Sequence, residues 1–498
     1  MKILSFGAKL ASKFYSRRFR SWEKESVVLQ QKVFNSLIEK GKDTSFGEEH
    51  NFAGINNYDD FKKHVPIRDY ESYKHYIERI IQGEEKVLWP AKTLYFAKSS
   101  GTTSGTKYLP ISSDSIHNHV NCARLGLLMY VHKTGNTDFL KGKLMFVSGS
   151  PKLEKTGGIL TGRLSGISNH HVPGFLKKIQ LPSYETNCIE HWEEKLDKII
   201  KETKDQNLTF ISGIPSWVEM YFDRLLKKTG KQSVSEIFPG LSLYMHGGVN
   251  FKPYETRFQQ LIGKDIDTMD TYPSSEGFIG FQDEFPGEGM ILIPDEGIFF
   301  EFIPVKDFDK PDAPRLSLEE VETGVNYVVI INNNAGIWGY NLGDTVRFIS
   351  TNPYRLIVTG RIKHYISAFG EHVIAEEVES AIAEACQKTG AEIKEFTVAP
   401  LVNNPEGRPC HEWFVEFSKK PSSLEDFKNI LDKYVQEKNN YYRELVEGNV
   451  LQPLLLKPVK RNSFMEYMKS IGKLGGQNKT PHLKNDRSVA EFLQDYLE

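Results

Sequence analysis

The sequence lacks several features that mark whole classes of protein. Its 498 residues include four cysteines, at positions 122, 188, 386 and 410, and no two of them form a Cys-x-x-Cys pair. Such spacing indicates neither a zinc ribbon nor a disulfide framework, and it is typical of reduced thiols in a cytoplasmic protein. Formal net charge is only −2, from 63 Lys and Arg against 65 Asp and Glu. A charge this close to zero excludes a generally basic chain that wraps nucleic acid, so any anion site must be local.

Long hydrophobic runs are also missing. No stretch of about 18 apolar residues occurs, so we expect no membrane span. The N-terminal segment MKILSFGAKLASKFYSRRFR is basic, and Lys2, Lys9 and Lys13 leave no clean hydrophobic segment before a cleavage site. We therefore expect a solvated first helix that packs on the body of the protein, rather than a signal peptide or a membrane anchor.

What is present is a helical start followed by alternating strands and helices. Up to about Gln82, apolar residues recur at helical spacing, and beyond it short apolar runs alternate with amphipathic stretches. This alternation favours an α/β body whose sheets are covered by helices. The predicted strands are Thr93–Lys98, Lys143–Val147, Leu208–Ile211, Leu241–Met245 and Asp267–Met269, and the predicted helices are Ile116–Val131, capped by Ser112 or Ser113, and Trp217–Lys228.

From Met290 the chain becomes rich in strand-like segments. The run MILIPDEGIFFEFIPV predicts a hairpin that turns at Asp295-Glu296-Gly297, and strands follow in TGVNYVVIINNN, DTVRFIS and YRLIVTGR. After Arg361 the predicted order is helix, strand, strand, helix and a last apolar run, which is a small α+β unit. We therefore expect a large domain over residues 1–362 and a small domain over residues 363–498. The predicted elements of the small domain are Ala375–Lys388, Glu395–Pro400, Trp413–Phe417, Leu424–Lys438 and the apolar run near Leu451–Leu456.

The strongest single motif is the run SSGTTSGTK at residues 99–107. It follows a predicted strand and precedes a predicted helix, where exposed backbone N–H groups and hydroxyls are able to surround a polyphosphate. It is not a Walker A loop, because three residues separate its glycines and Thr106 stands before Lys107. A flexible loop that binds no ligand is the alternative.

Four further motifs are weak one by one. Tyr272 offers an aromatic face for a base, and Glu276 in the same run offers an oxygen ligand for magnesium. The glycines of His246–Gly248 allow a flat ring to lie on the main chain. Asp344 at a tight turn is able to accept hydrogen bonds from ribose hydroxyls, and Lys479 lies in a late Gly-rich loop. Each motif also fits an ordinary turn or a solvated residue.

In this order along one chain, the motifs resemble those of the adenylate-forming ANL superfamily. The match is closer to the auxin-responsive acyl-acid amido synthetases, the Gretchen-Hagen-three family. The three nucleotide signatures of that family look like Ser99–Thr103, Tyr272–Glu276 and Tyr340–Asp344 here, and the ending QNKTPHL is similar to its Gln-x-Lys-Thr-Pro. The resemblance spans roughly residues 95 to 482.

Two positions depart from the family pattern. Asn341 stands where the third signature often has Arg, and His372 stands where plant members tend to carry Lys. The first departure leaves the ribose acceptor Asp344 in place. The second leaves open whether His372 takes over the phosphate contact that the lysine makes in plant members. The resemblance also implies that residues 1–362 bind nucleotide and acyl group, and that residues 363–498 move about a hinge near Arg361–Lys363.

The resemblance implies an enzyme that uses ATP and Mg²⁺ in two half-reactions. A carboxylic acid attacks the α-phosphate and releases pyrophosphate, and the amine of an amino acid then attacks the acyl-adenylate and expels AMP. The implied catalytic residues are Lys479, Thr103 and Glu276, of which Glu276 is the metal ligand. The implied nucleotide-binding residues are Ser99, Ser100, Gly101, Thr102, Thr103, Lys107, Gly247, Gly248, Tyr272, Ser274, Ser275, Asp344 and Arg361.

The helix after the phosphate loop is expected to line the acyl pocket. Its candidate residues are Asn121, Arg124, Leu125 and Leu128, and Arg124 fits a substrate carboxylate as well as a structural surface role. The expected partners are a small carboxylic acid and an amino acid in the cytoplasm, with no nucleic acid. Two alternatives stay open, namely an acyl-CoA ligase that shares the first half-reaction and a non-catalytic nucleotide-binding scaffold.

Overall fold

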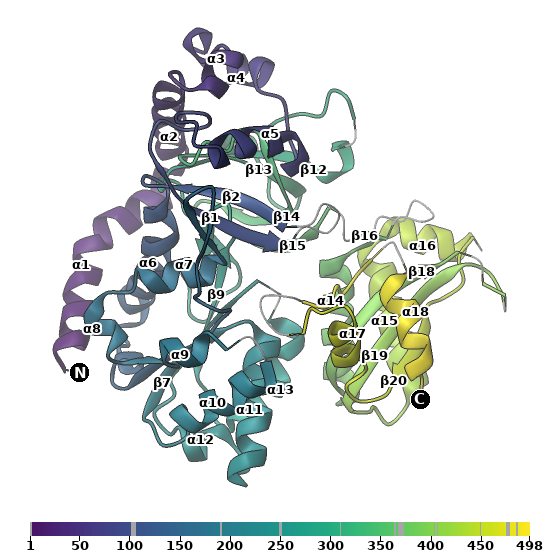
Figure 1. The fold of residues 1–498 in the computed structure, drawn as a ribbon. Helices are drawn as coiled ribbons and strands as arrows, with labels where there is room; N and C mark the ends of the chain where they lie inside the picture. The colour runs from purple at the N-terminus through teal and green to yellow at the C-terminus, as the bar shows by residue number, and fades with distance from the viewer. Residues whose placement is uncertain are drawn as a thin grey trace. The chain divides into compact units, whose positions relative to one another are not determined.

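In the computed structural model, the chain forms two compact units (Figure 1). The first unit comprises Met1–Gly248, Asp265–Leu342 and Val346–Ile357, and the second comprises Val249–Lys264, Gly343–Thr345 and Val358–Glu498. The residues described are 2–100, 106–189, 192–248, 251–308, 310–362, 365–366, 373–402, 404–405, 407–448, 450–474, 479–484 and 487–498. The division of domains after residue 362 stays a prediction.

The predicted helical start is confirmed. It consists of α1 (Lys2–Lys24), α2 (Ser26–Gly41), α3 (Ser45–Glu49), α4 (Tyr58–His64) and α5 (Tyr70–Ile81). Three of these helices begin after a residue whose side chain accepts a backbone N–H of the first turn, namely Thr44, Asn57 and Asp69. As expected, α1 packs on the body, where Phe19 and Trp22 are buried. Within the described ranges, no helix is both long and apolar enough to cross a membrane.

Two sheets and the helices around them build the first unit. A sheet with the order β2-β1-β5-β4 contains β1 (Thr93–Ser100), β2 (Thr106–Ser112), β4 (Glu154–Thr156) and β5 (Ile159–Gly162). A large sheet has the order β12-β13-β14-β15-β11-β10-β9-β8-β7-β3-β6. Its strands are β3 (Lys143–Val147), β6 (Gln180–Leu181), β7 (Leu208–Gly213), β8 (Leu243–Gly247), β9 (Asp267–Pro273), β10 (Phe278–Phe281), β11 (Met290–Leu292), β12 (Ile298–Pro304), β13 (Asn326–Asn333), β14 (Tyr340–Thr351) and β15 (Tyr354–Arg361).

Neighbouring strands β6, β3, β7, β8 and β9 run parallel, so their carboxyl ends share one edge of the large sheet. The crossovers between these strands contain helices, as the alternating pattern predicted. The helices of this part are α6 (Ile116–Thr134), α7 (Leu164–His170), α8 (Gly174–Lys177), α9 (Tyr184–Asn187), α10 (Trp192–Thr203), α11 (Pro215–Thr229) and α12 (Val234–Ile237). In Figure 1, α1 runs beside α6, and the two helices are in contact.

The predicted hairpin after Met290 is wrong. Strands β11 and β12 belong to the same sheet, but β13, β14 and β15 lie between them. The turn residues Asp295 and Glu296 instead bind Arg18 of α1, whose Nε lies 3.0 Å from Oδ2 of Asp295. An ion pair with a distant helix therefore holds this segment, which a local turn pattern does not reveal.

The second unit contains the helices and strands that the sequence predicts after Arg361, and it also takes in Val249–Lys264 and Gly343–Thr345. Its three-stranded sheet has the order β18-β19-β20, and helices α14 and α15 pack against each other. The elements are α13 (Glu255–Ile262), β16 (Tyr365–Ile366), β17 (Val373–Ile374), α14 (Ala375–Thr389), β18 (Glu392–Leu401), β19 (Cys410–Lys419), α15 (Leu424–Lys438), α16 (Asn440–Glu447), β20 (Leu455–Val459), α17 (Ser463–Ser470) and α18 (Ser488–Leu493). Its core includes Val378, Phe396 and Leu431.

Candidate active site

The Ser/Thr/Gly run connects two antiparallel strands. Ser99 pairs with Lys107 and Ser100 with Thr106 in the β1–β2 ladder. The predicted helix α6 does follow the run, but the strand β2, which was not predicted, comes between them. The N-cap of α6 is Ser115, and neither Ser112 nor Ser113 takes that place.

Several predicted phosphate ligands of this run cannot be placed. Gly101, Thr102 and Thr103 lie outside the described residues, as do the side chains of Ser99 and Ser100. Lys107 is described, and its ammonium lies 5.5 Å from the centre of the Tyr70 ring. This cation–π contact holds the lysine on β2, beside the connection from β1.

The glycines at the end of β8 lie against β9. A Cβ at Gly247 would stand 2.4 Å from the carbonyl oxygen of Thr271, so only glycine fits there. The Thr271 hydroxyl donates to the carbonyl of His246 at 2.6 Å, and Gly248 has a φ of +83°. Close packing of two strand ends and a left-handed backbone thus explain both glycines, and their contact with an adenine ring stays a prediction.

The second signature forms a turn between β9 and β10. Tyr272 at the end of β9 is buried. The backbone N–H of Ser274 donates to the carbonyl of Gly277 at 3.0 Å, and Asn333 Nδ2 donates to the carbonyl of Glu276 at 2.8 Å. These bonds fix the backbone and leave Glu276 with a partly exposed side chain.

The Glu276 carboxylate is able to bind Mg²⁺ only together with the phosphates of a bound nucleotide. No group of three or more His, Cys, Asp or Glu side chains in the described ranges is placed to hold a metal ion. In sites of that kind, Mg²⁺ is bound by one or two carboxylates together with substrate phosphates, and it keeps several waters. A single half-exposed glutamate, Glu276, meets that requirement.

In the second unit, Asp344 and Arg361 form an ion pair. Nε of Arg361 lies 2.7 Å from Oδ1 of Asp344, and the Thr359 hydroxyl donates to that of Thr345 at 2.8 Å. The expectation of a tight turn is wrong here, because Asp344 lies within β14. Its carboxylate is mostly buried, whereas the Arg361 side chain is half exposed.

Lys479 belongs to the same electrostatic cluster. Burial and, after it, the positive charge of Arg361 together lower the pKa of its ammonium to about 8, although Asp344 and Glu379 oppose the shift. Because Lys479 also keeps exposed surface, water reduces the effect of burial on its pKa. The structure therefore brings together Asp344, Arg361 and Lys479, three residues predicted for the site.

No sequence motif pointed to a role for His482, which follows Lys479-Thr480-Pro481. His482 Nδ1 lies 2.7 Å from Glu379 and its Nε2 lies 3.0 Å from Glu395. The two carboxylates outweigh the opposing effect of burial and raise the pKa of His482 to about 10, so it is an imidazolium at neutral pH. The backbone N–H of Val398 donates to the His482 carbonyl at 2.9 Å. The chain directly after Lys479 is therefore anchored to β18.

The candidate acyl-pocket residues on α6 lie toward α1. Nη2 of Arg124 donates to the Tyr15 hydroxyl of α1 at 3.5 Å, on an exposed surface. Leu125 and Leu128 are buried in an apolar core that also contains Phe19 of α1. Asn121 is half buried. Their contact with an acyl group stays a prediction.

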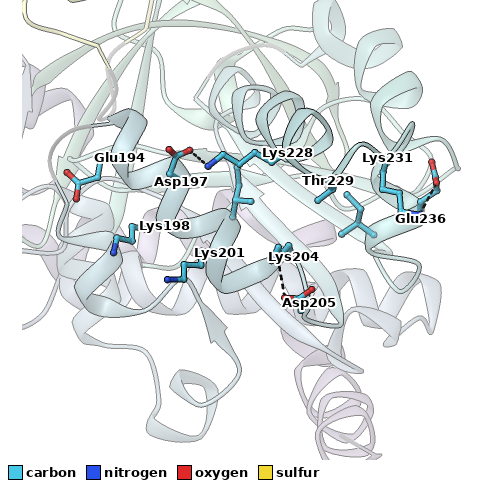
Figure 2. Close-up of a pocket in the computed structure, with 12 residues that line it drawn as sticks. Glu194, Asp197, Lys198, Lys201, Lys204, Asp205, Lys228, Thr229, Lys231 and Glu236 are labelled. Atoms are coloured by element: carbon cyan, nitrogen blue, oxygen red, sulfur yellow. Dashed lines mark ion pairs between the residues drawn. The ribbon is translucent and has the colours of Figure 1, made fainter.

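A groove between α10, α11 and α12 contains none of the predicted residues. Figure 2 shows lysines and acids along it, with Lys228 2.7 Å from Asp197 and Lys231 3.6 Å from Glu236. The lining residues named here form ion pairs on the surface, and such pairs are common without function. The groove is therefore not a candidate active site.

Comparison with known proteins first defines the class of fold. With a TM-score of 0.61, the structure resembles a 2-hydroxyisobutyryl-CoA ligase in the postadenylation state, at 13% identity over 95% of this chain and 91% of that one. It is more similar to an acyl acid amido synthetase, AtGH3.15 in complex with 2,4-DB, with a TM-score of 0.80 and 18% identity over 98% and 96% of the two chains. The fold is that of the adenylate-forming enzymes.

The family follows from the sequence. The GH3 family N-terminal domain matches residues 16–171 and 161–266, the central domain matches 291–361 and the C-terminal domain matches 376–488. The chain belongs to the GH3 family. Among its relatives, the jasmonoyl–L-amino acid synthetase JAR4 of Nicotiana attenuata is 22% identical over 540 residues, which cover 93% of this chain and 92% of that protein.

Proposed function

We propose that this protein is an ATP-dependent acid–amino acid ligase that forms AMP. The observation that carries the proposal is the GH3 family match over three successive domains. The similarity to a jasmonoyl–L-amino acid synthetase along nearly the whole of both chains supports the same reaction class. In the first half-reaction, a carboxylate oxygen attacks the α-phosphorus of ATP and pyrophosphate leaves. In the second, an amine attacks the acyl carbon, loses a proton and expels AMP.

We propose that the first unit holds the triphosphate and the base. Lys107 and the hydroxyls and backbone N–H groups of residues 99–103 bind the polyphosphate, while Tyr272 and Gly247-Gly248 contact the adenine. Ser274 and Ser275 lie beside them in the second signature. Attack on phosphorus is catalysed mainly by positioning and by charge stabilisation, which such groups supply without covalent chemistry.

Glu276 is the proposed ligand of Mg²⁺. When bound, the ion supplies positive charge that stabilises the oxygens of the phosphates. The turn that Asn333 fixes orients the Glu276 backbone, and the carboxylate stays accessible to a phosphate-bound ion.

In the second unit, we propose that Asp344 accepts hydrogen bonds from the ribose hydroxyls. Lys479 neutralises charge that develops on the α-phosphate during adenylation. Arg361 holds Asp344, and residues 363–498 rotate about the segment near it, so that one adenylate meets two different sets of side chains. Four free cysteines are typical of the cytoplasm, which is the compartment we propose.

The test is acid-dependent release of pyrophosphate, followed by mass spectrometry of the product. We expect pyrophosphate only when ATP, Mg²⁺ and a carboxylic acid from a panel are all present, and an amide when an amino acid is added. A CoA thioester without an amide would favour the acyl-CoA ligase, whose fold is shared but less similar. ATP binding without pyrophosphate release would favour a scaffold and contradict the proposal.

A further inference from the structure

Two cationic side chains of the first unit, one buried and one half-buried, have no acidic partner among the residues the structure describes. Lys195 in α10 is 2% exposed, and its Nζ donates to the carbonyls of Ser148 and Asn187, at 2.8 Å in each case. Arg163, which directly precedes α7, is largely shielded from water, and burial is the cause that lowers its pKa. Burial also lowers the pKa of Lys195, to about 8. Buried cations are normally paired or bound to a ligand.

The two cations flank one peptide unit at the carboxyl end of β3. A Cβ at Gly149 would meet Cδ of Arg163 at 2.9 Å and Nη1 at 3.7 Å, so the missing side chain lets the guanidinium lie against the main chain. Lys195 binds the carbonyl of the preceding residue, Ser148. The charge of Arg163 also lowers the pKa of Lys195, and the nearby Cys188 opposes this. Two like charges near each other, one of them buried, repel unless an anion joins them.

Unused hydrogen-bonding groups lie beside the two cations. Both amide atoms of Asn187 are buried without a partner in the described part of the chain, although its backbone carbonyl accepts from Lys195. The indole N–H of Trp192, one turn before Lys195 on α10, is also buried and unpaired there. An ammonium has three donors, of which Lys195 uses two, and a guanidinium has five. Such a set of donors suits a carboxylate, which accepts a bidentate arginine and further N–H groups.

We propose that Arg163 and Lys195 bind the α-carboxylate of the amino acid acceptor. Val147, at the end of β3, pairs with Gly213 of β7, and β7 lies beside β8, which ends at Gly247. The cations thus lie at the sheet edge that carries the proposed adenine site, where α/β proteins bind ligands. This inference rests on the proposed function. The acid that is activated loses its charge in the adenylate, whereas the α-carboxylate of the acceptor stays ionised throughout and is the better match for permanent cations.

The experiment compares Arg163→Met and Lys195→Met with Lys198→Met, which removes an exposed lysine from the same helix. For each protein, we measure the pyrophosphate burst with acid alone, KM for the amino acid, and KM for its carboxamide. We expect the burst to stay within about twofold in all three. We expect KM for the amino acid to rise at least tenfold in Arg163→Met and in Lys195→Met. KM for the carboxamide should barely change in either variant. Melting temperatures show that each variant stays folded under the assay conditions.

Three results would overturn this assignment. They are an unchanged KM for the amino acid, an equal rise for its carboxamide, and a raised KM for the acid in the burst, which would assign the cations to the acyl substrate. If the parent protein releases no pyrophosphate with any acid, the proposed function itself fails. Ligand-induced thermal stabilisation then decides the inference. The amino acid must raise the melting temperature of the parent and of Lys198→Met, but not that of Arg163→Met or Lys195→Met.

An independent observation concerns the outward face of α1. The face that packs on the body contains Phe19 and Trp22, and the opposite face exposes Ile3 by 86%, Phe6 by 71%, Leu10 by 62% and Phe14 by 80%. At about 100° per residue, the four exposed apolar side chains fall within an arc of about 80°. Large exposed apolar patches of this kind mark interaction sites.

Charge identifies the kind of surface that fits this stripe. Residues 2–20 contain six Lys or Arg and no Asp or Glu. Of these cations, Arg18 forms ion pairs with Asp295 and Glu296. A helix with an apolar stripe flanked by cations is typical of segments that lie in a membrane interface. We propose that α1 binds an anionic lipid surface through Ile3, Phe6, Leu10 and Phe14. The cytoplasmic leaflet supplies such a surface.

The probe is co-sedimentation of the full chain with vesicles of phosphatidylcholine alone or mixed with phosphatidylglycerol. We expect at least tenfold stronger binding to the anionic vesicles, weaker binding at high salt, and loss of binding in the double variant F6S/L10S. The control Val28→Ser removes an exposed apolar side chain from α2 and should bind as the parent does. The proposal would be overturned by absence of binding or by equal binding to neutral vesicles. It would also be overturned if the parent is a dimer and F6S/L10S is a monomer.

Discussion

The imidazole Nδ1 of His482 lies 2.7 Å from Oε1 of Glu379 in the second unit. Its other ring nitrogen lies 3.0 Å from Glu395, and the ring stacks on Phe396 with centres 4.2 Å apart. Glu379 also interacts with the ammonium of Lys479, three residues before His482. One carboxylate therefore links the anchored part of this segment to the proposed catalytic lysine.

Replacing His482 should change both stability and its dependence on pH. Folding raises the pKa of His482 from 6.5 to about 10, so its contribution is complete below pH 6.5 and is lost as pH rises through 10. We expect His482→Gln to destabilise the protein by about 3 kcal/mol near pH 6.5, because two buried carboxylates lose their cation. The difference should shrink as pH approaches 10, in urea unfolding followed at several pH values. The control His75→Gln changes an exposed histidine, and a constant difference for His482→Gln would contradict the prediction.

Lys479→Ala should slow adenylation without weakening ATP binding. Loss of one group that stabilises developing charge typically reduces the rate by about 100-fold, because its contact strengthens only in the transition state. A pyrophosphate burst gives the rate, and equilibrium titration gives the affinity, which should stay within about threefold. Lys473→Ala, an exposed lysine upstream, is the matched control. Equal burst rates for parent and Lys479→Ala would remove Lys479 from the mechanism.

The same lysine predicts an alkaline limit to activity. Because the pKa of Lys479 is about 8 and the charged form is needed, kcat/KM for ATP should fall as pH rises above 8. Lys479→Arg keeps its proton at any such pH and should shift this limb upward, even where its rate is lower. Identical profiles for the two proteins would show that another group sets the limit.

Asp344→Ala should weaken ATP binding about tenfold, because loss of one charge-assisted hydrogen bond to a ribose hydroxyl costs about 1.5 kcal/mol. Stability should change by less than about 1 kcal/mol, since the partner Arg361 is half exposed and regains water. Isothermal titration and thermal melts separate the two effects. A large loss of stability with normal ATP affinity would make the aspartate structural.

Gly247→Ala should destabilise the fold by about 2 kcal/mol through overpacking, since its new methyl group meets the Thr271 carbonyl at 2.4 Å and backbone does not readily yield. Gly7→Ala makes the same change within α1, where nothing lies within 4 Å, and should be neutral or stabilising by up to about 1 kcal/mol. Thermal melts check both. Similar melting temperatures for the two variants would show that β9 moves aside.

Much of the fold is predictable from local pattern. The helix Leu424–Lys438 has the predicted bounds, because Ser423 caps its start and apolar residues recur at helical spacing. The strands β3, β7 and β9 also begin where predicted. Pairing is different, since β11 and β12 are adjacent in sequence and yet three strands separate them in the sheet. Turn residues alone did not reveal this, because the choice of partner depends on strands further along the chain.

The order of the motifs along the chain predicted the candidate site, although each motif by itself was weak evidence. Three short signatures and the ending QNKTPHL, in that order, predicted the GH3 family, which the domain matches confirm. No sequence motif indicated that Arg163 and Lys195 lie close together. Lysine on an amphipathic helix usually faces solvent, and only the packing of α10 on the end of β3 buries this one.

By itself, the sequence determined which segments are helices or strands and which signature residues occur in which order, because both depend on neighbours a few positions away. The tertiary structure decided which charges meet. Glu379 and His482 are 103 residues apart, and Arg18 and Asp295 are 277 apart. Coulomb and hydrogen-bond energies act only over a few ångströms, so their partners are defined only when distant segments have packed.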